Sequence, residues 1–109
     1  MGRIANMLTE PPGPRAREIV AADHRYLATA TKASPVAVSH AEGGKVTDVD
    51  GNTYLDFASG ISVMNVGHSH PRVVKAVQEQ ASRLFHFAGT DFYYDAQVAL
   101  AKKLTEMAP

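Results

Sequence analysis

The stretch "YLDFASGISVMNVGHSHPRVV", from Tyr54 to Val74, decides how this chain folds. Its first residues, among them two aromatic ones, are typical of a β-strand. Its last residues begin a helix at Pro71, because proline suits the first turn of a helix. The run between them is longer than the about two to six residues that usually join a strand to a helix. This length predicts that the run does more than connect.

Three short β-type segments lie in and before this stretch, at 36–40, 45–49 and 53–57. The first two are separated by Gly43-Gly44 and the last two by Asp50-Gly51-Asn52, and such residues tolerate the positive φ angles of tight hairpin turns. The sequence therefore predicts a small antiparallel meander.

Helices are expected on both sides of the meander. Residues 1–14 end in "EPPGP" and are expected to form an extended arm, and Pro14 then suits the first turn of a helix that runs from 15 to about 31. A second helix begins at Pro71, and a third begins at Asp95, which can cap it. In the second helix apolar residues recur every three to four positions, at Val73, Val74, Val77, Ala81 and Leu84. In the third, the residues expected to face inward are Val98, Ala101, Leu104 and Ala108. The predicted class is α+β, with residues 15–109 following the arm.

The overall composition limits the range of partners. A chain of 109 residues has the size of one domain, and its 11 basic and 11 acidic residues give no net charge. It therefore lacks the basic field that binding to nucleic acid or to an anionic membrane surface requires. No segment approaches the ~20 apolar residues of a membrane span, and the first residues do not resemble a signal peptide. The chain contains no cysteine, and we expect a cytoplasmic protein.

His68 and His70 suggest a metal site, because two imidazoles one residue apart can converge on one ion. A zinc site needs three or four ligands, however, and the other histidines and carboxylates show no recognised ligand spacing. The favoured interpretation is structural and predicts no metal. Ser69 or His70 would satisfy free amides at the start of the helix, and His68 would fold the loop back on itself.

Two loops contain residues suited to binding a small molecule. Gly60 and Gly67 bracket the apolar segment "ISVMNV", and an apolar loop is expected to face a core, another subunit or a ligand. In "HFAGTDFYYD", aromatic residues surround Gly89 and Thr90, an arrangement that fits simple packing and a ligand pocket about equally well. The chain has no nucleophile elbow, P-loop or dinucleotide fingerprint, so we expect no catalytic residue in it.

The segment "GGKVTDVDGNTYLDFASGISVMNVGHSHPRVVKAVQEQASRLFH" resembles the N-terminal signature of the class III aminotransferases. These are fold-type I pyridoxal-phosphate enzymes, among them 4-aminobutyrate, ornithine and acetylornithine aminotransferases. The motifs "DVDG", "YLDF" and "GHxHPxVxxAV", followed by "AGTDFY" and "QVALAKKL", occur in the family's order over about 15–109. The resemblance implies a part of the small domain of a much longer α/β enzyme, at the dimer interface and at the mouth of the active site.

The resemblance also implies roles for individual residues. Ile61 matches a substrate-pocket position where ornithine aminotransferases use tyrosine, so its aliphatic side chain suggests an ω-amino substrate such as 4-aminobutyrate. The residues implied for substrate binding are Ile61, Ser62, Val63 and Phe87, and those implied for cofactor binding, in the same subunit or across the dimer, are Gly89 and Thr90.

None of the lysines matches the family's Schiff-base motif, so pyridoxal phosphate is expected only in the complete enzyme, and this chain alone is expected to be inactive. The leading hypothesis is therefore the N-terminal portion of an aminotransferase that moves an amino group from an amino acid to a 2-oxo acid. Its expected partners are the remainder of that enzyme and a second copy, in a homodimer or larger assembly. The alternatives are an amino-acid racemase of the same family and a stand-alone protein-interaction module, with a metal protein ranked behind them.

Overall fold

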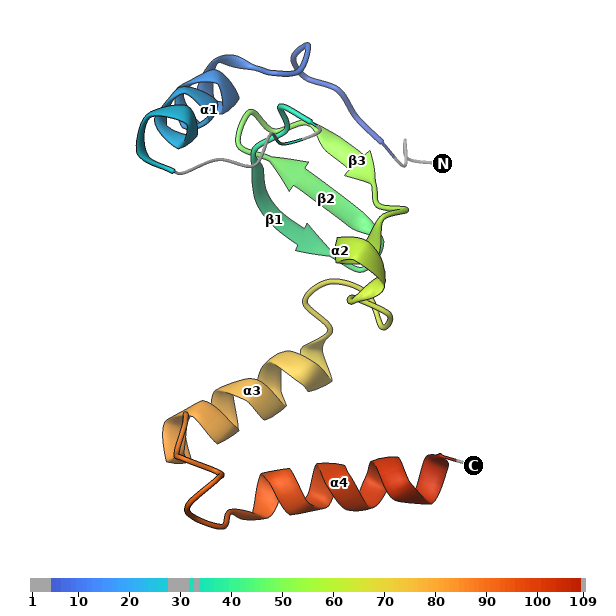
Figure 1. Ribbon diagram of the computed structural model, residues 1–109. Helices are drawn as coiled ribbons and strands as arrows, with labels where there is room; N and C mark the ends of the chain where they lie inside the picture. Colours follow the sequence, from blue (N-terminus) through green and yellow to red (C-terminus); the bar gives the residue numbers. More distant parts are fainter. Residues whose placement is uncertain (1–4, 28–31, 33, 109) are drawn as a thin grey trace. The chain divides into compact units, whose positions relative to one another are not determined.

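The computed structural model describes residues 5–27, 32 and 34–108. Figure 1 shows α1 (Pro14–Tyr26), β1 (Val38–Glu42), β2 (Lys45–Asp48), β3 (Thr53–Leu55), α2 (Ser59–Ser62), α3 (Pro71–Arg83) and α4 (Asp95–Met107). The expected α+β class is confirmed. The chain divides into two compact units, Met1–Val74 and Lys75–Pro109.

The meander forms one antiparallel sheet in the order β1-β2-β3. Its first strand lies two residues later in the chain than the predicted 36–40, because Glu42 pairs with Lys45 across the two-residue Gly43-Gly44 turn. Opposite charges pair favourably across strands, and Gly43 supplies the positive φ of 56° that the turn needs. β2 and β3 begin where predicted and end one and two residues early.

Helix α1 begins at Pro14, which occupies the first turn as expected. It ends at Tyr26, not near residue 31, because Leu27 is extended, with φ −103°, and its amide closes the helix on the carbonyl of Asp23. Residues 28–31 of the predicted helix lie outside the described residues. At the N-terminal end, the carboxylate of Asp50 accepts hydrogen bonds from the amides of Arg15 and Ala16, both at 2.8 Å.

Helices α3 and α4 also follow the predicted pattern at their starts, with one correction. Asp95 is the first helical residue and not the cap; the cap is Tyr94, which is extended and makes no side-chain hydrogen bond to the helix. The residues expected to face inward in α4 are not buried, since Leu104 is 58% exposed. The recurring apolar residues of α3 are not buried either, and Val77 is 60% exposed. The described residues therefore leave the apolar faces of both helices uncovered.

The buried interior of the described part is small and largely polar. Ala16 is its one buried hydrophobic residue, and Asp48 and Asn52 are its buried polar ones. The side chain of Asn52 accepts hydrogen bonds from the amides of Leu8 and Thr9 at 2.5 and 2.7 Å. Through these bonds the buried Asn52 holds the segment before α1 against the sheet.

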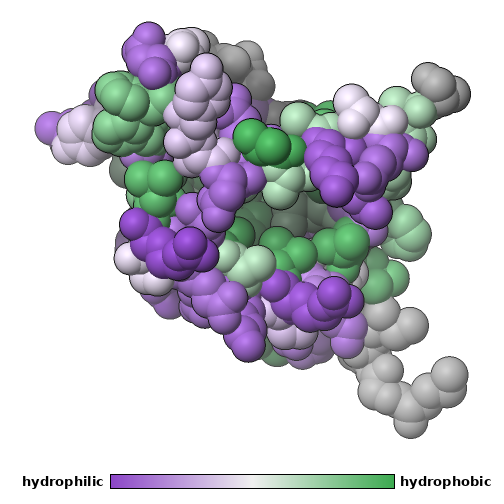
Figure 2. Space-filling view, turned by 90° about the horizontal axis from the view of Figure 1, so that it is seen from below, coloured by the Kyte–Doolittle hydropathy of each residue, from purple (hydrophilic) through white to green (hydrophobic). Residues whose placement is uncertain are grey.

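Hydrophobic side chains are common at the surface instead, and Figure 2 shows them lying between hydrophilic ones. Among the most exposed are Phe57 at 92%, Ile61 at 91% and Phe85 at 89%. No helix in the part of the chain that the structure describes has the length and apolar character needed to cross a membrane.

Candidate functional site

The long connection between β3 and α3 returns to the turn from which it starts. At its beginning, the amide of Asp56 donates to the carbonyl of Gly44 at 3.0 Å. At its end, His68 and Gly43 exchange two backbone hydrogen bonds of 2.9 Å each. Both ends of the connection are thus fixed to the β1–β2 turn, as in an Ω-loop. We call residues 56–68 the substrate loop, because the residues predicted to bind substrate, Ile61, Ser62 and Val63, lie within it.

The close approach at the end of the substrate loop requires a glycine. Gly67 has a φ of +84°, and a Cβ atom at this position would lie only 3.1 Å from the Cα atom of Gly43. Residues with a side chain rarely adopt this φ, and the neighbouring backbone leaves little space for one. Gly67 therefore lets the loop return to the turn.

Asp56 links the two ends through its side chain. One carboxylate oxygen accepts hydrogen bonds from the amides of Ala58 and Ser59 at 2.8 and 2.9 Å. The other lies 2.6 Å from Nε2 of His68, and because a carboxylate can only accept, Nε2 is the donor. The hydrogen bonds from His68 and from the Ser59 amide hold the pKa of Asp56 below its usual value. The side chain of Asp56 is only 10% exposed and that of His68 only 20% exposed.

The element labelled α2 is a left-handed turn. Ser59, Gly60, Ile61 and Ser62 have φ angles of 51°, 59°, 61° and 62°. This backbone costs an L-residue about 1–2 kcal/mol, and it is least suited to a β-branched residue such as Ile61. The turn closes through the amide of Val63, which donates to the carbonyl of Ser59 at 2.8 Å.

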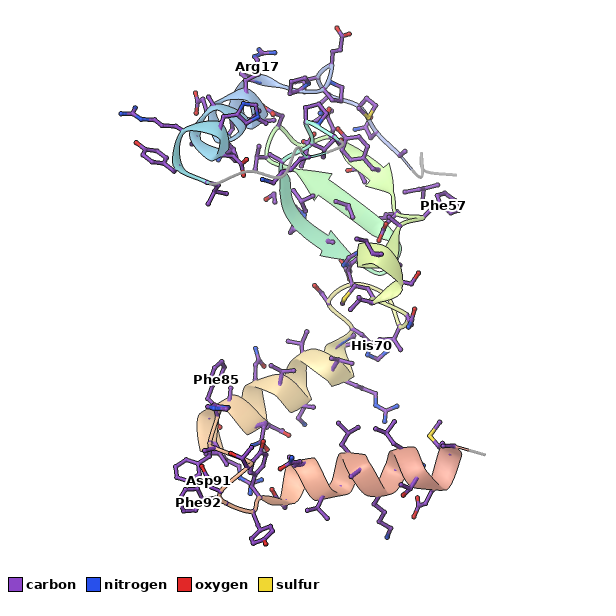
Figure 3. The ribbon with its side chains drawn as sticks, in the orientation of Figure 1. Arg17, Phe57, His70, Phe85, Asp91 and Phe92 are labelled. Carbon is purple, nitrogen blue, oxygen red and sulfur yellow. The ribbon has the colours of Figure 1, made fainter. Side chains whose placement is uncertain are left out.

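This turn brings together three of the residues expected to bind substrate, Ile61, Ser62 and Val63. Ile61 is 91% exposed and Val63 is 70% exposed. In Figure 3, Phe57 also projects away from the ribbon at the start of the loop. The substrate loop therefore displays an apolar surface on a strained backbone.

The other predicted residues, Phe87, Gly89 and Thr90, belong to the second unit and lie on the loop before α4. The rings of Phe87 and Phe92 meet edge to face, with their centres 4.7 Å apart. A Cβ atom at Gly89 would lie 2.9 Å from Oε1 of Gln97, so a larger residue would not fit without a shift of that side chain. Thr90 is exposed. In this unit the Phe87 ring takes part in packing.

The two histidines of the "GHSHP" motif have separate partners. His68 contacts Asp56, whereas Nδ1 of His70 accepts the amide of Arg72 at 3.3 Å. His70 thus supports the first turn of α3, where Figure 3 labels it, as one of the two predicted alternatives stated. The hydroxyl of Ser69 instead donates to the carbonyl of Ala41 at 2.8 Å. Within the described ranges, no group of three or more histidine, cysteine or acidic residues is placed to hold a metal.

Sequence reasoning assigned the loop-folding role to His68 but missed its partner, Asp56. The signal was present in "DFAS", because an aspartate directly after a strand often accepts the amides two and three residues later. Nothing in the sequence pattern joined that aspartate to a histidine at the other end of the loop.

The lysines do not fit the role of covalent cofactor attachment. Lys75 and Lys102 are 76% and 75% exposed and lie 3.7 and 3.8 Å from Glu79 and Glu106. Lys32 pairs with Asp23 and is 63% exposed. The remaining lysines, Lys45 and Lys103, are exposed as well. A reactive lysine needs a desolvated or charge-shaped pocket, and all five described lysines lie in solvent instead.

Comparison with known proteins identifies the family. The model of the family "Aminotransferase class-III" matches residues 26–109. This chain therefore belongs to the class III aminotransferases, as its motifs indicated.

Three relatives show the breadth of the match. The acetylornithine aminotransferase of Methanothermobacter thermautotrophicus is 37% identical over 84% of this chain and 23% of the relative. The isoleucine 2-epimerase of Lentilactobacillus buchneri is 34% identical over 87% of this chain and 22% of the relative. The 4-aminobutyrate aminotransferase of Mycobacterium bovis is 39% identical over 94% of this chain and 23% of the relative. The chain thus spans about a quarter of the length of these relatives.

The fold agrees with solved structures of the same family. The acetylornithine aminotransferase of Elizabethkingia anophelis superposes with a TM-score of 0.79 and 34% identity, over 84% of this chain and 24% of that one. The expectation that the fold is a part of a fold-type I aminotransferase is consistent with this likeness.

Proposed function

We propose that this chain is the N-terminal segment of a cytoplasmic, pyridoxal-phosphate-dependent aminotransferase that transfers an amino group from an amino acid to a 2-oxo acid. The observation that carries the proposal is the match of the class III family over residues 26–109. Aminotransferases among the relatives and among the structural neighbours support it.

Within that enzyme, the substrate loop would shape the pocket for the amino acid. Ile61 offers an aliphatic surface without a hydrogen-bonding group, and it is 91% exposed and so accessible to a ligand. Such a surface suits the unbranched methylene chain of an ω-amino acid such as 4-aminobutyrate. Ser62 and Val63 flank it on the same turn, and Phe87 would add an aromatic wall.

Pyridoxal phosphate would be held chiefly by the remainder of the enzyme, because the lysines of this chain are exposed. When bound, the cofactor supplies an electron sink that stabilises a carbanion next to the amino group. Gly89 and Thr90 would approach it, in their own subunit or in the partner of a homodimer. The 109 residues alone would then be inactive, and borohydride reduction of this chain with pyridoxal phosphate should label no single lysine stoichiometrically.

Racemisation of an amino acid is the second candidate, since one relative is an isoleucine 2-epimerase. The two reactions differ in their needs, because a racemase turns over a single amino acid without a 2-oxo acid. An interaction module without catalysis is a third candidate, favoured by the many exposed hydrophobic residues. This candidate requires that the protein form a complex of defined stoichiometry and catalyse neither reaction.

The test is to assay the complete protein that contains this segment, loaded with pyridoxal phosphate. We expect 4-aminobutyrate and 2-oxoglutarate to yield glutamate, with turnover that requires both substrates. Inversion of L-isoleucine or L-alanine without a 2-oxo acid would support the racemase instead. Absence of both reactions in a folded, cofactor-loaded protein would contradict the family-based proposal.

A further inference from the structure

The left-handed turn of the substrate loop needs support from outside its own backbone. Four consecutive residues, Ser59 to Ser62, have positive φ angles, and Gly60 is the only glycine among them. Left-handed conformations are ordinarily visited by single residues and not by runs of them. Strained backbone of this kind persists where surrounding contacts over-determine it.

Asp56 supplies this support at the start of the turn. Its carboxylate accepts the amides of Ala58 and Ser59, and so it fixes the backbone immediately before and at the first left-handed residue. The same carboxylate reaches across the loop to Nε2 of His68, 2.6 Å away. One side chain therefore joins the strained turn to the far end of the loop.

His68 is itself held by backbone bonds and does not depend on the turn for its position. It exchanges two hydrogen bonds with Gly43, and the hydroxyl of the following residue, Ser69, donates to the carbonyl of Ala41. The imidazole thus connects Asp56 to the sheet through a well-fixed residue. The pair is mostly shielded from solvent, at 10% and 20% exposure.

We propose that Asp56 and His68 are positioning residues that set substrate specificity: their contact keeps the turn at 59–62 left-handed and thereby fixes where Ile61 meets the substrate. This inference rests on the proposed function, because it assigns a role within the amino-acid pocket. Neither residue touches the substrate. They act by reducing the positions that the displayed apolar surface can take.

Three substitutions separate this role from a general structural one. His68→Ala removes the donor to Asp56, whereas His68→Gln returns an N–H group near the same place. Asp56→Asn keeps an oxygen for the two amides but replaces the acceptor for His68 with a donor. His70→Gln is the matched control, because His70 belongs to the same motif but its side chain accepts a hydrogen bond from the amide of Arg72 and makes none to the substrate loop within the described residues.

Two readouts are needed on the complete, cofactor-loaded enzyme. The first is hydrogen exchange of the peptide covering 57–64 without substrate, which we expect to be faster in His68→Ala and Asp56→Asn and unchanged in the control. The second is steady-state kinetics with 4-aminobutyrate, in which we expect KM to rise about tenfold in His68→Ala with kcat nearly unchanged, as loss of ground-state positioning predicts. His68→Gln should recover most of the change in both readouts.

The outcomes distinguish this inference from the proposed function. Unchanged exchange at 57–64 in His68→Ala would overturn the inference whatever the activity. An active wild-type enzyme whose exchange accelerates but whose KM does not move would overturn it as well. A folded wild-type enzyme with neither transfer nor racemisation would refute the proposed function, even if the exchange results held.

Discussion

Replacing Asn52 with alanine should release the segment before α1 from the sheet. The Asn52 side chain is fully buried and accepts hydrogen bonds from the amides of Leu8 and Thr9 at 2.5 and 2.7 Å. It also donates to the hydroxyl of Thr9 at 3.0 Å and to the carboxylate of Asp48 at 2.8 Å.

The magnitude follows from these bonds. Each contributes about 0.5–1.5 kcal/mol net, and a buried group left without a partner costs about 1–3 kcal/mol. Leu8 is 63% exposed, so its amide can gain water once the segment detaches, which limits the loss. We therefore expect the segment's opening free energy to fall by about 2–4 kcal/mol, which is about 30- to 1,000-fold in its opening equilibrium.

Native-state hydrogen exchange measures this local opening directly, because it does not require the whole protein to unfold. The amides of Asn6, Leu8 and Thr9 should lose protection by that factor in Asn52→Ala. Asn65→Ala is the matched control, since Asn65 is exposed and its side chain makes no hydrogen bond within the described residues. A loss of protection below about threefold, equivalent to under about 0.7 kcal/mol, would refute the reasoning.

Three further predictions concern Ile61, Gly67 and the Asp48–Tyr54 pair. Ile61→Tyr in the complete enzyme should raise the ratio of kcat/KM for ornithine over 4-aminobutyrate, without adding backbone strain because tyrosine is not β-branched; an unchanged ratio would count against the pocket assignment. Gly67→Ala should destabilise the substrate loop by about 1–3 kcal/mol in exchange measurements, because it combines a φ of +84° with a Cβ only 3.1 Å from backbone. Gly44→Ala is the control, because its Cβ would meet nothing within 4 Å, and it should change the stability of the substrate loop far less. Equal destabilisation by the two variants would contradict the close-approach argument. The thermal midpoint of unfolding should vary with pH through the Asp48–Tyr54 hydrogen bond of 2.8 Å. Burial raises the pKa of Asp48, but hydrogen bonds from Asn52, Tyr54 and the backbone outweigh this and lower it, whereas burial and the contact with Asp48 raise the pKa of Tyr54. The stability that Asp48 contributes is therefore present above its unfolded pKa and is lost as pH falls. The stability that Tyr54 contributes is present below its unfolded pKa and is lost as pH rises. The hydrogen-bond network should thus stabilise the fold most between about pH 4 and 10. Tyr54→Phe should remove the alkaline dependence, and a wild-type alkaline limb that persists in this variant would exclude Tyr54 as its source.

Element types and starts were predictable because their signals are local. Proline in the first turn marks the starts of α1 and α3, and Gly43 and Gly51 mark the hairpin turns, whatever the rest of the chain does. The first strand was misplaced because "VAVSH" contains the β-branched residues typical of a strand, whereas its register is set by the pairing of Glu42 with Lys45. A pairing partner lies elsewhere in the chain, and the residue types of one segment do not report it.

The prediction that the apolar face of α4 is buried was wrong for a related reason. The spacing of Val98, Ala101 and Leu104 indicates an apolar face, and the structure has the expected helix, but spacing carries no information about what covers that face. For the candidate site, too, one feature was predicted and another was missed. Ile61, Ser62 and Val63 were predicted from the resemblance to bind substrate, and that role stays a prediction. They share one turn, whose left-handed backbone was missed because only Gly60 hinted at it.

The length of the substrate loop follows from its geometry. Asp56 and His68 lie 2.6 Å apart at its two ends, and Gly43 and Gly44 receive both ends at one turn. Closing such a loop costs entropy that rises only with the logarithm of its length, so extra residues add little to that cost. A connection of ordinary length could start a helix but could not return to its origin and also hold a left-handed turn between. The residues that join β3 to α3 are therefore numerous because they fix both ends of a loop whose middle, with Ile61, is displayed.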